Sequence, residues 1–336
     1  MRKSSSLRAP KGRSNLIRRD CFALLRFRLA VLAMTAFSMF LLMTGLSSPV
    51  SAEPEVLGDA APRAMWVWKS DPINDERVRS ELFKLCNRTA VHKLFLPVGG
   101  YPLSEQKAVF QEKIGKFLQE CHAQGIQIHA LEGDPLWALK RYHFKVLRSL
   151  EGYLQFNRGR PSTQRIDGFQ LDIEPYALPQ WKTGYQELLK RQLLDLVIEC
   201  RRMIDQERDG HPLLLGIAVP FFYDRDPEFE KALLSQVDYI ALMAYFDTGA
   251  EIIKKGRSHV EEAAQAGKKI IIGVETQDIA RTGQGERRNT FYEEGWEEME
   301  RQLAEVVASF SGGSSFDGLA IHAYDSYRVL QRERKG

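Results

Sequence analysis

Eight short apolar segments, spread from residue 64 to residue 322, limit what this chain of 336 residues can fold into more than any other feature. They are residues 64–68, 92–98, 125–131, 166–173, 213–219, 239–244, 269–274 and 319–322. Each segment is short enough for a strand, and most are apolar almost without a break. Such runs are typical of parallel strands that are covered on both faces.

Amphipathic segments separate most of these expected strands. Residues 76–86, 107–124, 185–203 and 296–310 carry apolar residues at intervals of three and four, the repeat of a helix buried on one side. Strands that alternate with helices predict parallel βαβ units. Eight such units in about 270 residues fit a closed barrel better than an open sheet. The sequence therefore predicts an α/β fold, a (β/α)8 TIM barrel over residues 63–333.

The first 52 residues have the pattern of an export signal. They contain nine Lys or Arg residues and a single acid, Asp20, and residues 29–46 carry no charge and are mostly apolar. Small residues follow, and the step Val50-Ser51-Ala52 predicts signal cleavage after Ala52. An uncleaved membrane anchor is the alternative, because an apolar stretch of about 18 residues is just long enough to span a bilayer. In either case the basic flank stays inside, so we expect an exported protein, periplasmic or secreted. Residues 53–62 are expected to be a linker.

The charge of the body differs from that of the whole chain, which has a net charge of +3. Without residues 1–52, the chain keeps 38 basic and 43 acidic residues, a net charge of −5. This balance argues against nucleic acid as a partner. Contact with a membrane is expected only through the N-terminal segment, if that segment is not removed.

Metal and cofactor chemistry has no support in the sequence. Cys86, Cys121 and Cys200 fall in helical stretches, and no His, Cys, Asp or Glu residues have the spacing of a metal site. No glycine-rich phosphate loop is present. We therefore expect neither a metal nor a cofactor.

Carboxylates and aromatic residues gather at the carboxyl ends of the expected strands, which is where TIM barrels carry their active sites. Aromatic faces stack on sugar rings, and carboxylates bind hydroxyls and transfer protons, so this combination suits a carbohydrate. The expected catalytic residues are Glu174, Asp172 and Glu275. The expected substrate contacts are Trp66, Trp68, Glu132, Gln170, Tyr245, Asp247, His322 and Tyr324.

The fourth expected strand carries the most informative pattern. Phe169, Leu171 and Ile173 alternate with Gln170, Asp172 and Glu174. Because side chains alternate along a strand, the apolar set is expected to face the helices and the polar set the barrel interior. Two carboxylates stacked in this way favour sharing one proton, which raises the pKa of one of them. A raised carboxyl pKa is what a general acid needs near neutral pH.

This segment resembles the Asp-Gly-x-Asp-x-Asp-x-Glu signature of family 18 glycoside hydrolases, the chitinase-like barrels. Asp167, Gly168, Asp172 and Glu174 match the signature, and Gln170 stands where the family has its middle Asp. The resemblance implies that Glu174 protonates the leaving glycosidic oxygen. It implies that Asp172 holds or accepts a proton and orients the substrate.

A second segment, around the sixth expected strand, resembles that family's Met-x-Tyr-Asp strand. Met243 and Tyr245 match, and the aspartate, Asp247, comes one residue later than in the family. The resemblance implies that Tyr245 bonds an N-acetyl group of the substrate, which acts as the nucleophile. The chain is therefore interpreted as a distant relative of the family.

Glu275 leaves a second mechanism open. It ends the seventh expected strand, where another large group of barrel glycosidases carries its nucleophile. With Glu174, it would form a two-carboxylate site, retaining if the pair is about 5 Å apart and inverting if the separation is roughly 6.5–9.5 Å. Otherwise Glu275 only positions a ligand.

Two functions follow from these patterns. The first is an exported glycoside hydrolase that acts on a polysaccharide or oligosaccharide by carboxylate acid/base catalysis. The second is a non-catalytic glycan-binding barrel in polysaccharide export or biofilm assembly, suggested by Gln170 and by the late position of Asp247. A deacetylase is a third reading, which the missing metal-ligand spacing disfavours.

Overall fold

The computed structural model describes residues 61–99, 108–207 and 213–333. The expected signal or anchor, residues 1–52, and residues 53–60 of the expected linker lie outside the described residues. Within the described part, no helix combines the length and the apolar character needed to cross a membrane.

Eight parallel strands close into a barrel in sequence order, and β8 pairs with β1. This confirms the predicted (β/α)8 TIM barrel. The strands are β1 (Arg63–Trp66), β2 (Val91–Leu96), β3 (Gln127–Glu132), β4 (Gly168–Leu171), β5 (Leu214–Pro220), β6 (Tyr239–Met243), β7 (Lys269–Glu275) and β8 (Phe316–His322).

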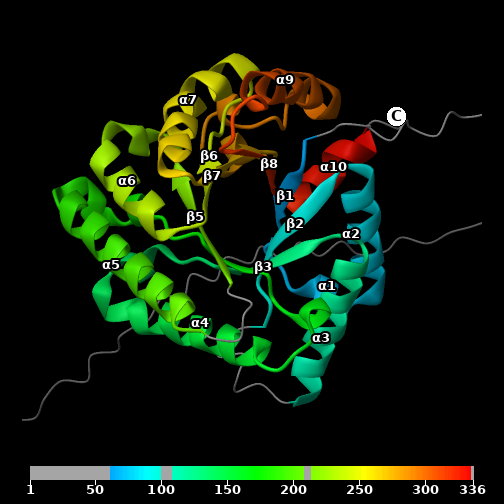
Figure 1. Cartoon of the computed structure of the whole chain (residues 1–336). Helices are drawn as coiled ribbons and strands as arrows, with labels where there is room; N and C mark the ends of the chain where they lie inside the picture. Colours follow the sequence, from blue (N-terminus) through cyan, green and yellow to red (C-terminus); the bar gives the residue numbers. More distant parts are fainter. Residues whose placement is uncertain (1–60, 100–107, 208–212, 334–336) are drawn as a thin grey trace, which may run out of the picture. The chain divides into compact units, whose positions relative to one another are not determined.

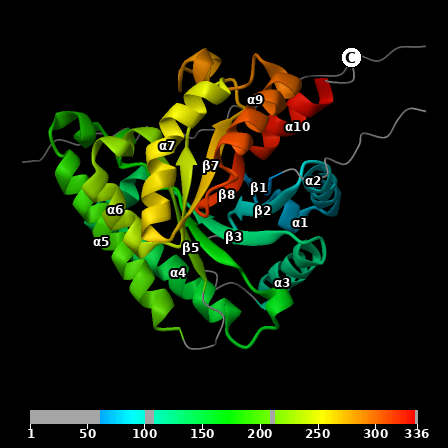
Figure 2. The ribbon, with the colours of Figure 1, turned by 45° about the horizontal axis from the view of Figure 1, so that its top comes forward.

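Helices surround the barrel, as both views of the ribbon show (Figures 1 and 2). The longer ones are α2 (Glu76–Arg88), α3 (Ala108–Ala123), α4 (His143–Asn157), α5 (Gln186–Asp205), α6 (Pro227–Gln236), α7 (Gly249–Ala266), α9 (Gly295–Phe310) and α10 (Tyr324–Glu333). Two single-turn helices, α1 (Asp71–Asn74) and α8 (Ile279–Thr282), lie in loops. The four helices expected from the apolar repeat are therefore present, with ends that differ by at most two residues.

Local signals in the sequence set where several helices begin and end. The Asp75 carboxylate accepts hydrogen bonds from two backbone N–H groups in the first turn of α2. The side chains of Asp226 and Thr248 each accept one such hydrogen bond, at the starts of α6 and α7. These caps satisfy N–H groups that have no partner inside the helix. Gly267 ends α7 with a positive φ of 66°, which glycine adopts without strain.

The lower part of the barrel interior is filled by aromatic side chains that face glycines. Nδ1 of His129 lies 2.7 Å from the hydroxyl of Tyr239, and the rings of Tyr239 and Phe95 stack. A Cβ atom added to Gly168 would lie 2.2 Å from the ring of His129, and one added to Gly216 would lie 2.1 Å from the ring of Tyr239. Glycine is required at both positions, because close packing leaves no room for a side chain.

The two faces of β4 are divided as predicted. Phe169, Leu171 and Ile173 are buried in the large apolar cluster between strands and helices. Gln170 is fully buried in the barrel interior, where its Oε1 lies against Gly216 of the neighbouring strand. The alternation along the strand therefore carries Asp172 and Glu174 to the interior side, at the carboxyl end of the barrel.

Candidate active site

Asp172 and Glu174 extend β4 beyond its last ladder residue. The backbone N–H of Asp172 donates to the carbonyl of Glu132 at 2.9 Å, so the pairing with β3 continues. A Cβ atom added to Gly133 would lie 2.5 Å from the carbonyl oxygen of Asp172. Glycine at position 133 therefore lets the two strand ends approach closely. Asp172 is buried with 8% exposure, whereas Glu174 is partly exposed.

Trp66 forms the floor beneath Asp172. Its indole Nε1 donates to Oδ2 of Asp172 at 3.1 Å, which links β1 to β4 across the barrel. Gly273 on β7 makes room for the far edge of the indole, because a Cβ atom there would lie 3.3 Å from the ring. Trp66 is fully buried. It therefore presents no open ring face, and the sugar-stacking role expected for it does not fit this geometry.

Asp172 is the carboxyl group of the pair that holds a proton near neutral pH. Burial raises the pKa of Asp172 to about 7, and the charge of Glu174 contributes to the rise. His322 and the hydrogen bond from Trp66 act in the opposite direction. Oδ1 of Asp172 is buried and has no hydrogen-bond partner among the described residues. A neutral carboxyl group tolerates such a position better than a carboxylate does.

Tyr176 orients Glu174 and was not anticipated from the sequence. Its hydroxyl donates to Oε1 of Glu174 at 2.6 Å. Burial and the charge of Glu174 raise the pKa of Tyr176, so the phenol keeps its proton at neutral pH. The available signal was Pro175, which begins a short 3-10 turn and brings position 176 back over the strand end.

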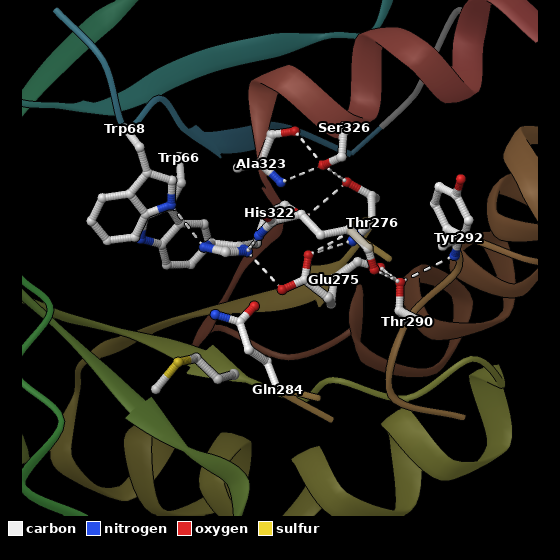
Figure 3. A network of polar contacts seen from close by, with 12 residues as sticks. Trp66, Trp68, Glu275, Thr276, Gln284, Thr290, Tyr292, His322, Ala323 and Ser326 are labelled. Carbon is white, nitrogen blue, oxygen red and sulfur yellow. Dashed lines mark hydrogen bonds and ion pairs between the residues drawn. The ribbon is translucent and has the colours of Figure 1, made fainter. Parts of the chain in front are cut away.

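Glu275 and His322 face each other on the opposite side of the barrel mouth. They are register partners on β7 and β8, and Oε2 of Glu275 lies 2.8 Å from Nδ1 of His322 (Figure 3). Oε1 accepts hydrogen bonds from the backbone N–H groups of Thr276 and Gln277, both at 2.8 Å. Glu275 is 3% exposed. Both oxygens of Glu275 already have hydrogen-bond partners and the side chain is buried, so a nucleophilic role for Glu275 does not fit. Its carboxylate instead holds the ring of His322.

His322 connects this buried carboxylate to the surface. Nε1 of Trp68 lies 2.8 Å from Nε2 of His322, and Trp68 is 45% exposed. The ring of Trp66 packs edge-on against His322 from below, at a centroid distance of 5.6 Å. Burial acts to lower the pKa of His322, but its hydrogen bond to Glu275 and the nearby carboxylates outweigh burial and raise it.

Tyr245 completes the group at the mouth. Its ring centroid lies 5.8 Å from that of His322. Burial, followed by the charges of Glu275, Asp172 and Glu174, raises the pKa of Tyr245 well above its ordinary value, so its hydroxyl is a hydrogen-bond donor at neutral pH. The structure therefore brings together side chains from β1, β4, β6, β7 and β8.

Two expected substrate contacts, Glu132 and Tyr324, lie away from this group. Glu132 shares the outward-facing side of β3 with Ile128 and accepts a hydrogen bond from Tyr153 of α4. Tyr324 packs into the outer layer, with its ring beside Arg328. The rim positions expected for Glu132 and Tyr324 are therefore wrong, because both side chains turn toward the helices.

Two other expected contacts also differ in position. Gln170 lies on the interior side but is fully buried, below Asp172. The backbone N–H of Asp247 donates to the carbonyl of Arg288. The charge of Asp247 adds to the effect of burial in raising the pKa of Glu294. None of the described contacts joins Asp247 to the carboxylates of β4.

The opposite end of the barrel holds a cavity of about 180 Å³. Arg63, Lys93 and Asp317 are among its lining residues, with 3.5 Å between Nζ of Lys93 and Oδ2 of Asp317. This is the amino-terminal end of the strands, where TIM barrels do not carry their chemistry. In the part of the chain that the structure describes, no three His, Cys, Asp or Glu residues are grouped so that they would hold a metal ion.

Comparison with known proteins rests on the fold. No protein-family model and no curated protein matches the sequence. A family 18 chitinase from Pseudoalteromonas aurantia matches with a TM-score of 0.51 and 12% identity, covering 82% of this chain and 99% of that chain. The PgaB (BpsB) glycoside hydrolase domain from Bordetella bronchiseptica matches with a TM-score of 0.50 and 12% identity, covering 82% and 97%. The structural neighbours of this chain are thus family 18 chitinases and related TIM-barrel glycoside hydrolases, and what it shares with them is the fold.

Proposed function

We propose that the protein is an exported glycoside hydrolase that cleaves a polysaccharide at the carboxyl end of its barrel. The observation that carries this proposal is the pair of carboxyl groups at the end of β4. Asp172 is buried and holds a proton near neutral pH, while its neighbour Glu174 is partly exposed. A proton store beside an acid that reaches solvent is the arrangement that protonation of a leaving group requires.

In the proposed reaction, Glu174 donates a proton to the glycosidic oxygen as the bond from that oxygen to the anomeric carbon breaks. A water molecule supplies the hydroxyl group that the anomeric carbon gains, and the remaining proton returns to Glu174. Tyr176 fixes one oxygen of Glu174 by its hydrogen bond and leaves the other for the substrate. Asp172 keeps its own proton throughout, so the two carboxyl groups are not ionised together when Glu174 has given up its proton.

The bonding of Glu275 argues against a protein nucleophile on β7. Its two oxygens already accept hydrogen bonds or face His322. Attack by water, or by an N-acetyl group of the substrate, is consistent with this geometry. Tyr245 keeps its hydroxyl proton and lies beside His322, so we expect it to donate a hydrogen bond to such a group.

The decisive test replaces Glu174 by Gln and measures the release of reducing ends from neutral, N-acetylated and cationic polysaccharides. We expect turnover to fall at least about 100-fold, the typical contribution of a positioned general acid. Glu187→Gln is the matched control, because it makes the same change on an exposed side chain of α5. Undiminished release by Glu174→Gln would remove the proposed acid.

The same assay separates the alternative function. A glycan-binding barrel without activity would retain a polysaccharide and release no reducing ends in either the parent or the variant. Gln170 is the feature that favours this alternative, because it is buried below Asp172 at a position where the family 18 signature has an Asp.

Export is proposed from residues 1–52 alone. Cell fractionation is expected to place the body of the protein outside the cytoplasm, and N-terminal sequencing is expected to begin at Glu53 if the signal is cleaved. A full-length product in the membrane fraction would support the anchor instead. A cytoplasmic product would contradict export in both forms.

A further inference from the structure

Trp68 is an exposed aromatic ring that is held in place by a hydrogen bond. It lies two residues beyond β1 and is 45% exposed. Its indole nitrogen lies 2.8 Å from Nε2 of His322, and the two rings meet edge-on at 74° (Figure 3). A tryptophan that is both exposed and fixed offers a flat apolar face without the entropy cost of ordering it.

The hydrogen bond requires one protonation state of His322. An indole N–H group only donates, so Nε2 of His322 must accept with a free lone pair. The single proton of the neutral ring is then on Nδ1, which lies 2.8 Å from Oε2 of Glu275 and 3.0 Å from Nε2 of the Gln277 amide. The carboxylate of Glu275 accepts this proton, and the amide of Gln277 contacts the same nitrogen. A second proton would place N–H groups of His322 and Trp68 against each other and would break their bond.

We propose that His322 is a positioning residue that holds Trp68 as a sugar-stacking platform at the barrel mouth while the imidazole is neutral, and releases it when the imidazole becomes doubly protonated. The sugar as occupant rests on the proposed function. The coupling between the two rings stands on their geometry alone. Trp68 differs from buried Trp66 in having a face that a pyranose ring reaches.

The groups around His322 set the pH at which Trp68 is released. Glu275 faces it from β7, Asp172 and Glu174 from the end of β4, and Tyr245 from the end of β6. The three carboxylates favour the doubly protonated ring and raise the pKa of His322. The bond from Trp68 favours the neutral ring. The platform is therefore held above the pKa of His322 and released as the pH falls through it.

The coupling is tested on the full chain with ¹⁵N-labelled tryptophan and no ligand. The indole N–H signal of Trp68, assigned by its loss in Trp68→Phe, is followed by NMR as the pH changes. We expect it to titrate together with His322, and we expect Trp68→Phe to raise the pKa of His322, because the coupling is reciprocal.

Two variants make this measurement specific. His322→Gln supplies an oxygen that accepts from Trp68 and does not titrate, so the Trp68 signal is expected to lose its pH dependence. His92→Gln removes an exposed histidine of β2 and is expected to leave that dependence unchanged. A Trp68 signal that ignores the pH while His322 titrates would overturn the proposal, and so would an unaltered titration in His322→Gln.

The occupant is tested in a Glu174→Gln background, which prevents turnover, by retention on insoluble chitin and cellulose at pH 8 and pH 5. At pH 8, Trp68→Ala is expected to weaken retention about two- to tenfold, the range of an aromatic stacking contact. At pH 5, the parent is expected to fall to the level of Trp68→Ala, while His322→Gln keeps its retention. Phe144→Ala, which removes an exposed ring at the start of α4, is the control.

The outcomes separate the two proposals. Equal retention of the parent and Trp68→Ala at both pH values would overturn the platform, as would a failure of the parent to bind either polysaccharide. The proposed hydrolysis is decided independently by whether Glu174→Gln loses the release of reducing ends.

Discussion

The barrel mouth and the outer layer of helices contain the same kind of contact, a buried histidine against a glutamate, but the second ring nitrogen faces a different kind of partner in each. At the mouth, Glu275 faces Nδ1 of His322, and the indole N–H of Trp68 faces the other ring nitrogen. In the outer layer, Glu230 of α6 faces Nδ1 of His259 on α7, and the carbonyl of Phe221 faces the other nitrogen at 2.8 Å.

The partner of the second nitrogen decides what each histidine does. The carbonyl of Phe221 can only accept, so His259 carries a proton on both nitrogens and is an imidazolium ion. Burial acts to lower the pKa of His259, but Glu230 outweighs burial and raises it. His322 has a donor in that place, so its second proton has to displace Trp68. The outer pair is a fixed structural ion pair, whereas His322 at the mouth can gain a second proton only by losing its bond to Trp68.

Removing each glutamate should give the largest difference between the two regions. Glu230→Gln leaves a fully buried imidazolium without its counter-charge, and we expect a loss of about 3–5 kcal/mol in the free energy of unfolding. Glu275→Gln at the mouth should cost less, about 1–3 kcal/mol, because its single oxygen cannot accept both from the backbone N–H groups of Thr276 and Gln277 and from a neutral His322, so one hydrogen bond is lost. Denaturant unfolding at pH 8, where Trp68 is expected to be held by a neutral His322, measures both. Equal losses would show that the two histidines share one charge state.

A substitution at Asp172 tests whether the buried carboxyl group at the mouth lowers the stability of the folded protein. Its pKa of about 7 in the folded protein exceeds the ordinary value of 3.8. The protonated form is thus favoured by folding, and the stability that it confers is present below pH 4 and lost as the pH rises toward 7. Asp172→Asn should therefore stabilise the protein by roughly 2–4 kcal/mol at pH 8 and change it little at pH 4, while it lowers activity.

One control variant completes the Asp172 measurement. The chemically equivalent change in the outer layer, Asp226→Asn, should show the opposite sign, because Lys190 lowers the pKa of Asp226. An Asp172→Asn variant that is destabilised equally at both pH values would contradict a buried, protonated Asp172.

The fold was predictable from the sequence because its signal is repeated. Eight apolar runs with helices between them define parallel strands, and closure follows from their number. The orientation of β4 was also predictable, because Gln170, Asp172 and Glu174 alternate with apolar residues. The end of β4 was harder to predict, because the alternating pattern continues past Leu171, the last residue of the strand.

The individual contacts of the site were less predictable, because they depend on orientation and on partners far along the chain. On β3, Glu132 alternates with Ile128 and Ala130, which indicates the outward-facing side, whereas its place at the end of the strand suggested the rim. Its contact with Tyr153 of α4 decides between the two. The bond between Trp68 and His322 joins residues 254 positions apart. Local spacing carries no information about such a pair, although it placed both residues at the same end of the barrel.

A second matched contact gives the finest comparison of the two regions. The hydroxyl of Tyr176 donates to Glu174 at the mouth, and the hydroxyl of Tyr153 donates to Glu132 beneath α4. Tyr153→Phe removes one of the two side-chain donors of the partly buried Glu132, the other being Ser149, and should cost about 1–2 kcal/mol in unfolding free energy, with activity unchanged. Tyr176→Phe leaves an oxygen that solvent reaches, so stability should change by less than about 1 kcal/mol.

The readout for Tyr176→Phe is turnover, because its bond holds Glu174 in the direction of the substrate. We expect kcat to fall about three- to tenfold with KM nearly unchanged, the size of one lost hydrogen bond in the transition state. If Tyr176→Phe instead lost stability and kept its kcat, the hydroxyl would have the same purely structural role as Tyr153. The mouth and the outer layer would then differ only in their histidines.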